Sequence, residues 1–314
     1  IINLSINEGF LIGTKEIHDQ VIEKANQELI LEHDKIPYVS YPYEWSFSQL
    51  KDAAIFHLNF HLFLLKNDAT LIDASAYNVQ FIGSELKFID VLSIQKYKEG
   101  EYWKGHKQFC ENFLNPLILK SKKGIKFNNW FKGNLEGIDT NELNDLLSIF
   151  DKFSYNIFIH IHLLSKLQKK YTSNKTLKPI DKITKKISKK NLIAMLTQLR
   201  NFISKLRDKK DISTWDSYSV ENSYSVEEEN KKKSIVAKFS KKNNFDLVAD
   251  LGCNDGEYST LCLNNGCKRV IGFDFDINAI DKAYEKSLKR NLNFLPLYFD
   301  ATNPSANIGW FQNE

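Results

Sequence analysis

Residues 245–259 read FDLVADLGCNDGEYS, and this stretch decides the fold. An apolar, partly β-branched run leads to the acid Asp250. A turn with Gly252, Asn254 and Gly256 follows, and helix-forming residues then resume. This order is typical of a buried parallel strand, a tight turn and a helix N-terminus, where open α/β sheets bind nucleotide-like ligands. The stretch therefore predicts a cofactor site.

The glycine spacing disfavours NAD. A dinucleotide fingerprint that starts at Gly252 needs glycines at positions 254 and 257, where the chain has Asn254 and Glu257. Written as D-x-G-x-x-x-G, the segment resembles motif I of the class I S-adenosylmethionine-dependent methyltransferases, in which the middle glycine is often replaced. The resemblance implies that Gly252 and Gly256 let the backbone pass close to the methionine moiety. It implies that Asp250 meets the ammonium group.

Two further acids follow predicted strands in the positions that this superfamily uses. Residues 268–274, KRVIGFD, predict a second strand that ends at Asp274, where the fold places the carboxylate for the ribose hydroxyls. Asp276 is the competing acid, and we expect it to face solvent or the next helix. A helical pattern and a third apolar segment lead to Asp300, which matches the position that often contacts the adenine amine. The alternative is that these acids only cap strand ends of another doubly wound domain.

Composition and length set broad limits. The 314 residues are 42% hydrophobic, which suffices for a sizeable core and two domains, and the net charge is only +4. No segment predicts a transmembrane helix or a signal peptide. The cysteines form no C-x-x-C pair, so we expect a cytoplasmic protein with neither a zinc site nor disulfides; they are Cys110, Cys253, Cys262 and Cys267.

The N-terminal 165 residues predict a mostly helical domain. Residues 16–32 have apolar positions at helical spacing and predict a helix. The aromatic and proline-rich segment 37–45, PYVSYPYEW, predicts an extended or turning chain. A long apolar helix follows over residues 46–66, with Ser46 or Ser48 as the N-cap.

A second candidate site lies in this domain. Residues 71–81 and 86–92 predict two apolar strands that flank a loop, with Asp73, Asn78 and Asp90 as polar landmarks. Their spacing resembles the catalytic loop and metal-binding strand of protein-kinase-like phosphotransferases. That resemblance implies a C-lobe-like scaffold in which Asp73 orients a hydroxyl, while Asn78 and Asp90 hold magnesium with ATP.

The kinase pattern is incomplete. Leu71 stands two residues before Asp73, where a histidine is usual, and Val91 stands where the glycine after the second acid is expected. No glycine-rich loop and no phosphate-holding lysine precede the loop. The region therefore predicts either a kinase-like scaffold, which a pseudokinase would retain, or turn-forming residues that satisfy their own backbone.

Residues 102–131 are rich in aromatic residues and predict a packed core. His160 and His162 are two positions apart rather than three or four, so we do not expect them to form a metal site together.

Residues 166–230 predict a basic helical linker and a segment that precedes the cofactor motif. Lysines alternate there with apolar residues at helical spacing, so most belong to a solvated helix face. The alternative interpretation of these lysines is a non-catalytic module that binds RNA or another polyanion. Trp215, Tyr218 and Tyr224 are candidates to cover the cofactor, and ordinary packing is the alternative role.

The order of these segments resembles a group of bacterial methyltransferase-like proteins that includes nodulation host-specificity proteins. The resemblance implies a kinase-like N-terminal domain (1–165), the linker (166–230) and a Rossmann-like domain (231–314) that binds S-adenosyl-L-methionine. It identifies neither the methyl acceptor nor a general base. Because only three of about seven sheet strands are present, we expect the 314-residue chain to be a fragment with an unpaired first strand and little activity.

Overall fold

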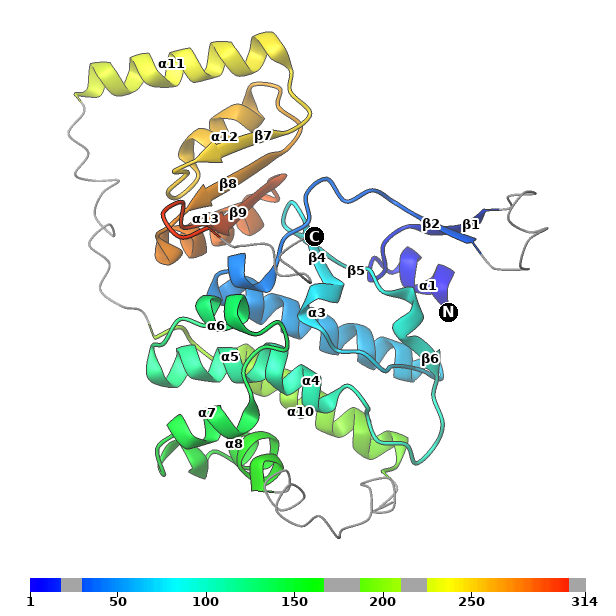
Figure 1. The fold of residues 1–314 in the computed structure, drawn as a ribbon. Helices are drawn as coiled ribbons and strands as arrows, with labels where there is room; N and C mark the ends of the chain where they lie inside the picture. Colours follow the sequence, from blue (N-terminus) through cyan, green and yellow to red (C-terminus); the bar gives the residue numbers. More distant parts are fainter. Residues whose placement is uncertain (18–29, 167–186, 210–224, 305–314) are drawn as a thin grey trace, which may run out of the picture.

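The computed structural model describes residues 1–17, 30–166, 187–209 and 225–304 (Figure 1). It is a mixed α/β structure with a mostly helical N-terminal part and a small C-terminal parallel sheet, which agrees with the predicted fold class at this level. Trp215, Tyr218 and Tyr224 lie outside the described residues. Among the described residues, no helix combines the length and the apolar character needed to cross a lipid bilayer.

The helices and strands have the following bounds. The α-helices are α1 (Ile2–Asn7), α3 (Phe47–Lys66), α4 (His106–Phe109), α5 (Asn115–Ile118), α6 (Asn128–Gly133), α7 (Thr140–Leu146), α8 (Tyr155–Ile157), α10 (Lys189–Lys205), α11 (Val226–Asn243), α12 (Glu257–Asn264) and α13 (Ile277–Arg290). The π-helical turns are η4 (Cys110–Leu114), η5 (Leu119–Lys123) and η7 (Phe158–Leu163), and the 3-10 turns are η1 (Pro42–Glu44), η2 (Ala76–Asn78), η3 (Val91–Ser93) and η6 (Asp151–Phe153). The strands are β1 (Thr14–Ile17), β2 (Ile30–His33), β3 (Ala69–Leu71), β4 (Val79–Ile82), β5 (Glu85–Phe88), β6 (Ile94–Lys96), β7 (Val248–Leu251), β8 (Val270–Asp274) and β9 (Phe294–Tyr298).

The C-terminal sheet contains the three predicted strands, all parallel and in the order β7, β8, β9. Helices α12 and α13 are the crossover connections, and α11 precedes the sheet and contacts α12. The register pairs Asp250 with Gly272 and Asp274 with Tyr298, so the carboxyl ends of the strands meet at one edge. The described part of β7 has a neighbour on one side only, and Leu251 is 75% exposed.

Helix α3 is the centre of the N-terminal part. Ser46 is its N-cap: the Ser46 hydroxyl accepts from the Gln49 amide while the Gln49 side chain accepts from the Ser46 amide. Helix α10 packs along α3 and buries one face, which consists of Leu192, Leu196, Leu199 and Ile203. The predicted helix in the basic segment is therefore present, and it packs into the same core as α3.

Two sequence predictions for the N-terminal part need correction. Residues 14–17 and 30–33 are the paired antiparallel strands β1 and β2, so the helix predicted for 16–32 is wrong at both described ends. The segment 71–81 is not one strand, because β3 ends at Leu71 and β4 begins at Val79. Between them, Asp73 and Ser75 form side-chain turns that break the extended backbone.

The two parts share one core. Helix α13 and strand β9 lie against the start of α3, and Ile271, Tyr284 and Leu297 belong to the same buried cluster as the α3 residues. The Gln49 side chain donates to the Pro296 carbonyl at 3.0 Å, and the Tyr284 hydroxyl donates to Asp52 at 3.0 Å. The sheet is therefore held at a fixed place relative to α3.

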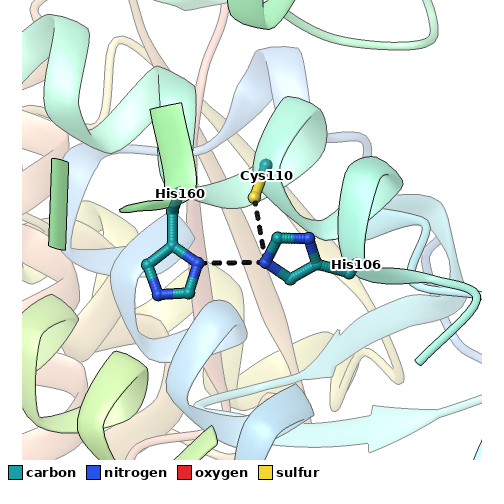
Figure 2. A group of neighbouring side chains, drawn as sticks. All are labelled: His106, Cys110 and His160. Carbon is teal, nitrogen blue, oxygen red and sulfur yellow. Dashed lines mark hydrogen bonds between the residues drawn. The ribbon is translucent and has the colours of Figure 1, made fainter. Parts of the chain in front are cut away.

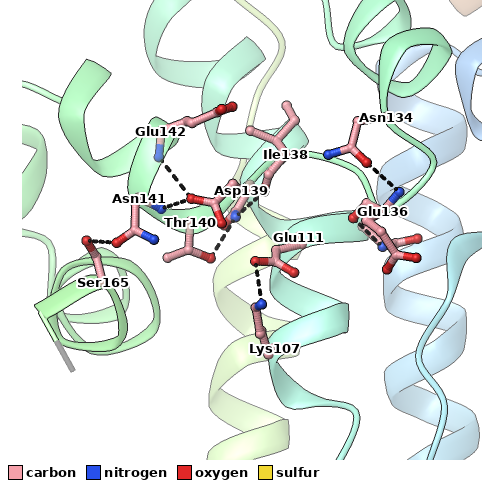
Figure 3. A network of polar contacts seen from close by, with 12 residues as sticks. Lys107, Glu111, Asn134, Glu136, Ile138, Asp139, Thr140, Asn141, Glu142 and Ser165 are labelled. Carbon is pink, nitrogen blue, oxygen red and sulfur yellow. Dashed lines mark hydrogen bonds and ion pairs between the residues drawn. The ribbon is translucent and has the colours of Figure 1, made fainter. Parts of the chain in front are cut away.

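A polar network fixes the loop before α7 against the helical segment of η4 and α5 (Figure 3). The buried Asn115 donates through Nδ2 to the Ile138 carbonyl at 2.8 Å and to the Thr140 hydroxyl at 3.0 Å. Asn112 donates to the Glu136 carbonyl at 2.9 Å, and its Oδ1 accepts from the Ala76 amide at 3.0 Å. Asn112 thus connects this loop to the segment that carries Asn78.

Candidate functional site

The turn between β7 and α12 has the backbone conformation that its sequence predicts. Gly252, Asn254 and Gly256 all have positive φ, at 76°, 47° and 80°. Glycine adopts this conformation without steric cost, and asparagine tolerates it better than most residues. The amide groups of Gly252 and Cys253 both donate to the Phe273 carbonyl, which fixes the start of the turn to the end of β8.

Asp274 fixes the turn from the neighbouring strand. Its Oδ2 accepts from the Asn254 amide at 2.9 Å, and its Oδ1 accepts from the Asp276 amide at 2.8 Å. A carboxylate has about four lone-pair positions, so each oxygen retains capacity for a further donor. Asp274 ends the second strand, as the sequence predicts, and the structure also places it against the glycine turn.

The other acids near this edge have distinct partners. Asp250 accepts from the Ser259 hydroxyl of α12 at 2.6 Å. Asp276 caps α13 by accepting from the Asn278 and Ala279 amides, which agrees with the expected role beside the following helix. Burial, and then the charges of Asp250 and Asp274, raise the pKa of the thiol of Cys253, a buried residue of the turn.

The two glycines differ in what surrounds them. A Cβ on Gly252 would meet no atom within 4 Å, so the space above this residue is open. A Cβ on Gly256 would lie 2.4 Å from the Phe294 ring, so packing alone accounts for this glycine. The open space above Gly252 is the place where a ligand could approach the backbone.

Asp300 follows β9 at the same edge and is half-buried. The Thr302 side chain and amide donate to its carboxylate, and these hydrogen bonds lower the pKa of Asp300. Lys132 of α6 adds a smaller electrostatic effect and donates to the Asn303 carbonyl at 3.1 Å. The helical part therefore reaches the residues that follow β9.

The aromatic segment 37–45 lies beside this edge of the sheet, which its composition did not reveal. The Tyr38 ring contacts the Phe273 ring edge-on at 5.9 Å, and Tyr41 and Tyr43 stack at 5.3 Å. Burial raises the pKa of Glu44 to about 7, against the hydrogen bond from the Tyr41 amide and the charge of Lys132. The segment brings a carboxyl group that titrates near neutrality to this side of the molecule.

The kinase-like residues are only partly brought together. Asn78 Nδ2 lies 3.4 Å from Asp90 Oδ2, so the expected metal-holding pair is in contact. Asp73 accepts from the Ser75 amide at 2.7 Å, and Asp90 accepts from the Leu92 amide at 3.0 Å and from the Ser93 hydroxyl. These are the hydrogen bonds of turn-forming residues.

Comparison with known proteins places the chain among the relatives of one curated protein. No family model matches the sequence. The sequence is 44% identical over 312 residues to "Nodulation protein NoeA" of Rhizobium meliloti (strain 1021), and the alignment covers 98% of this chain. The chain spans 66% of that protein's length. An identity of this size over nearly the whole chain indicates common descent, and the protein is a homologue of the nodulation protein NoeA.

Proposed function

We propose that the C-terminal part binds S-adenosyl-L-methionine and that the protein is a methyltransferase. The observation that carries the proposal is the contact between Asp274 and the glycine turn at the shared carboxyl edge of β7 and β8. Open α/β sheets bind their ligands at this edge. The open space above Gly252 gives the cofactor room to lie against the backbone.

Each candidate residue has a role in the proposed complex. Asp250 and the turn from Gly252 through Asn254 to Gly256 receive the methionine end. The free lone pairs of Asp274 receive the ribose hydroxyls, and Asp300 receives the adenine amine. Methyl transfer requires the sulfonium to be aligned with a nucleophile at close range, so the protein contributes mainly by positioning.

The relative's name connects this proposal to nodulation. We propose that the chain serves the same process, with the transfer of a methyl group as its chemical step. The support is the sequence identity over 98% of the chain, which includes both the helical part and the glycine turn.

Calorimetric titration of S-adenosylhomocysteine tests the cofactor site. We expect the natural full-length protein to bind it and Asp274→Asn to weaken binding at least about tenfold, which corresponds to roughly 1.4 kcal/mol. The matched control is Asp246→Ala, which removes an exposed acid just before β7, at the opposite end of the sheet, where Asp246 pairs with Lys268 at 2.6 Å. Unchanged affinity in Asp274→Asn, or no binding by folded wild-type protein, would contradict the proposal.

A second candidate is a phosphotransferase, and the contact of Asn78 with Asp90 is the observation that favours it. In this candidate the pair holds magnesium and ATP, and Asp73 orients the hydroxyl acceptor. Magnesium-dependent ATP binding that is lost in Asp90→Ala but kept in Asp274→Asn would identify this activity. Absence of such binding in folded wild-type protein excludes it.

A further inference from the structure

Three potential metal ligands from distant parts of the sequence converge in the helical part (Figure 2). His106 Nε2 lies 3.0 Å from His160 Nδ1 and 3.8 Å from Cys110 Sγ. All three ligand atoms lie within 4.8 Å of one another. Cys110 and His160 are buried, and His106 is half-buried.

The local helices explain this convergence. His106 and Cys110 are four residues apart, so they lie on the same face of the helical segment formed by α4 and η4. His160 comes from η7. Both η4 and η7 are π-helical turns, which are rare and are frequently found at functional sites. His162, in contrast, lies 3.0 Å from Asn144 and takes no part in the cluster.

The separations are close to those of a bound ion. A tetrahedral zinc ion with Zn–N bonds of about 2.0 Å and Zn–S bonds of about 2.3 Å places two nitrogens about 3.3 Å apart and a nitrogen and a sulfur about 3.5 Å apart. The two separations from His106 Nε2 differ from these values by about 0.3 Å. The distance between the ligand atoms of Cys110 and His160 is at most 4.8 Å. It has to shorten by at most about 1.3 Å to match a tetrahedral nitrogen–sulfur separation.

The surroundings hold the cluster in place. The buried Trp103 contacts the His106 ring edge-on at 5.9 Å. A Cβ on Gly105 would lie 2.9 Å from Trp103 Nε1 and 3.0 Å from the Ala74 Cβ, so the residue before His106 is tightly packed. The backbone that presents His106 therefore has little freedom to move.

We propose that His106, Cys110 and His160 bind one zinc ion. Two imidazoles and one thiolate suit this ion, whereas magnesium and calcium prefer oxygen ligands. Three protein ligands leave the fourth position of the tetrahedron to a water molecule. The ion would link the segment 106–114 to the segment 158–163. The proposal departs from the expectation, drawn from the sequence, that the cysteines form no zinc site.

Binding requires defined proton movements. His106 Nε2 and His160 Nδ1 form a hydrogen bond, so one of these two nitrogens carries a proton. When the ion binds, the imidazole that donates has to carry this proton on its other ring nitrogen. The Cys110 thiol releases its proton to solvent as the Zn–S bond forms. One zinc ion therefore displaces one thiol proton, and no oxidation or reduction takes place.

Cobalt substitution tests the site through the geometry of its ligands. The test is a titration of Co²⁺ and then Zn²⁺ into the purified, untagged and metal-stripped protein, followed by absorption. We expect one equivalent of Co²⁺ to give the intense visible bands of tetrahedral coordination and a near-ultraviolet thiolate-to-cobalt band, and Zn²⁺ to displace it. Wild-type spectra without the thiolate band, in protein shown to be folded, would overturn the proposal.

The variants assign the ligands. We expect Cys110→Ser to remove the thiolate band and to raise the zinc dissociation constant at least tenfold, and His160→Gln to raise it similarly. The matched controls are Cys262→Ser, a buried cysteine of α12, and His162→Gln, two residues from His160. We expect both controls to keep the wild-type spectrum and affinity. A thiolate band that persists in Cys110→Ser would also overturn the proposal, and circular dichroism shows whether each variant is folded.

Discussion

Ser48 of α3 donates two hydrogen bonds to the side chain of Asp281 in α13, one from its backbone amide and one from its hydroxyl. The Ser48 amide donates to Asp281 Oδ1 at 3.0 Å, and the Ser48 hydroxyl donates to Asp281 Oδ2 at 3.1 Å. Asp281 is only 4% exposed, so these hydrogen bonds satisfy a buried carboxylate. Ser48 therefore joins the helical part to the sheet rather than capping α3.

We predict that Asp281→Ala destabilises the whole described structure. The substitution leaves the Ser48 amide without its acceptor, which costs about 1 to 3 kcal/mol for a buried donor. Urea denaturation measures the loss. The exposed Glu285→Ala in the same helix is the control and should change the unfolding free energy by less than about 0.5 kcal/mol. Equal effects in both variants would contradict this role for Asp281.

The two glycines of the cofactor turn should respond differently to alanine. At Gly252 only the positive φ opposes a side chain, so we expect Gly252→Ala to cost about 1 kcal/mol of stability. At Gly256 the new Cβ also collides with the Phe294 ring, so we expect a cost of about 3 kcal/mol or more. Thermal unfolding of the two variants tests this order, and a smaller loss for Gly256→Ala would show that the Phe294 contact is wrong.

A negative charge at position 115 should destabilise the protein more than removal of the Asn115 side chain. Its Nδ2 faces the Ile138 carbonyl and the Thr140 hydroxyl in a fully buried site. Asn115→Ala leaves the carbonyl unpaired and costs about 1 to 3 kcal/mol, whereas Asn115→Asp places a carboxylate oxygen against it and costs more at pH 7. Part of the stability lost in Asn115→Asp should return at pH 4, because the introduced carboxyl group becomes protonated and can donate a hydrogen bond.

Chemical denaturation at both pH values measures these effects. The exposed Asn134→Ala in the same loop is the control, with an expected loss below about 1 kcal/mol. An Asp variant that is as stable as the Ala variant at pH 7 would show that Asn115 does not donate to the carbonyl.

Glu44 should make the protein less stable as the pH rises. Its pKa is about 7 when folded, because of burial, and about 4.3 in an unfolded chain. The folded state therefore binds more protons between these values, so the unfolding free energy falls from pH 4.3 to pH 7. Glu44→Gln keeps an acceptor for the Tyr41 amide and removes this penalty.

We expect Glu44→Gln to match the wild type near pH 4.5 and to exceed it by about 2 kcal/mol at pH 8, after allowance for partial exposure of the side chain. Unfolding free energies across this range provide the measurement. Parallel pH curves for the two proteins would show that Glu44 titrates normally.

The sequence predicted the sheet well because the signals there are local. An apolar run, a glycine turn and an acid specify a strand end without reference to distant residues, and β7, β8 and β9 formed as expected. The position of Asp274 at the end of β8 was predicted in the same way, whereas its hydrogen bond to the turn was not. The β1–β2 pairing was missed because an apolar spacing that suits a helix also suits strands when a partner is available.

Contacts between distant segments could not be predicted from one sequence. The apolar face of α10 indicated burial, but nothing in the sequence named α3 as its partner. The four-residue spacing of His106 and Cys110 was available as a signal, whereas His160 joins them only through the folded chain. The same holds for segment 37–45, whose aromatic composition did not predict contact with Phe273.

The hydrogen bond from Gln49 to the Pro296 carbonyl also constrains how such proteins can exchange sequence. The helix that bears Gln49 and the strand that bears Pro296 are separated by most of the chain, yet each presents a surface shaped for the other. A chimera that joins the helical part of one homologue to the sheet of another would inherit two surfaces that did not evolve together. Inheritance of the two parts as a unit is therefore the expected pattern among relatives, and productive recombination should fall within a part rather than between them.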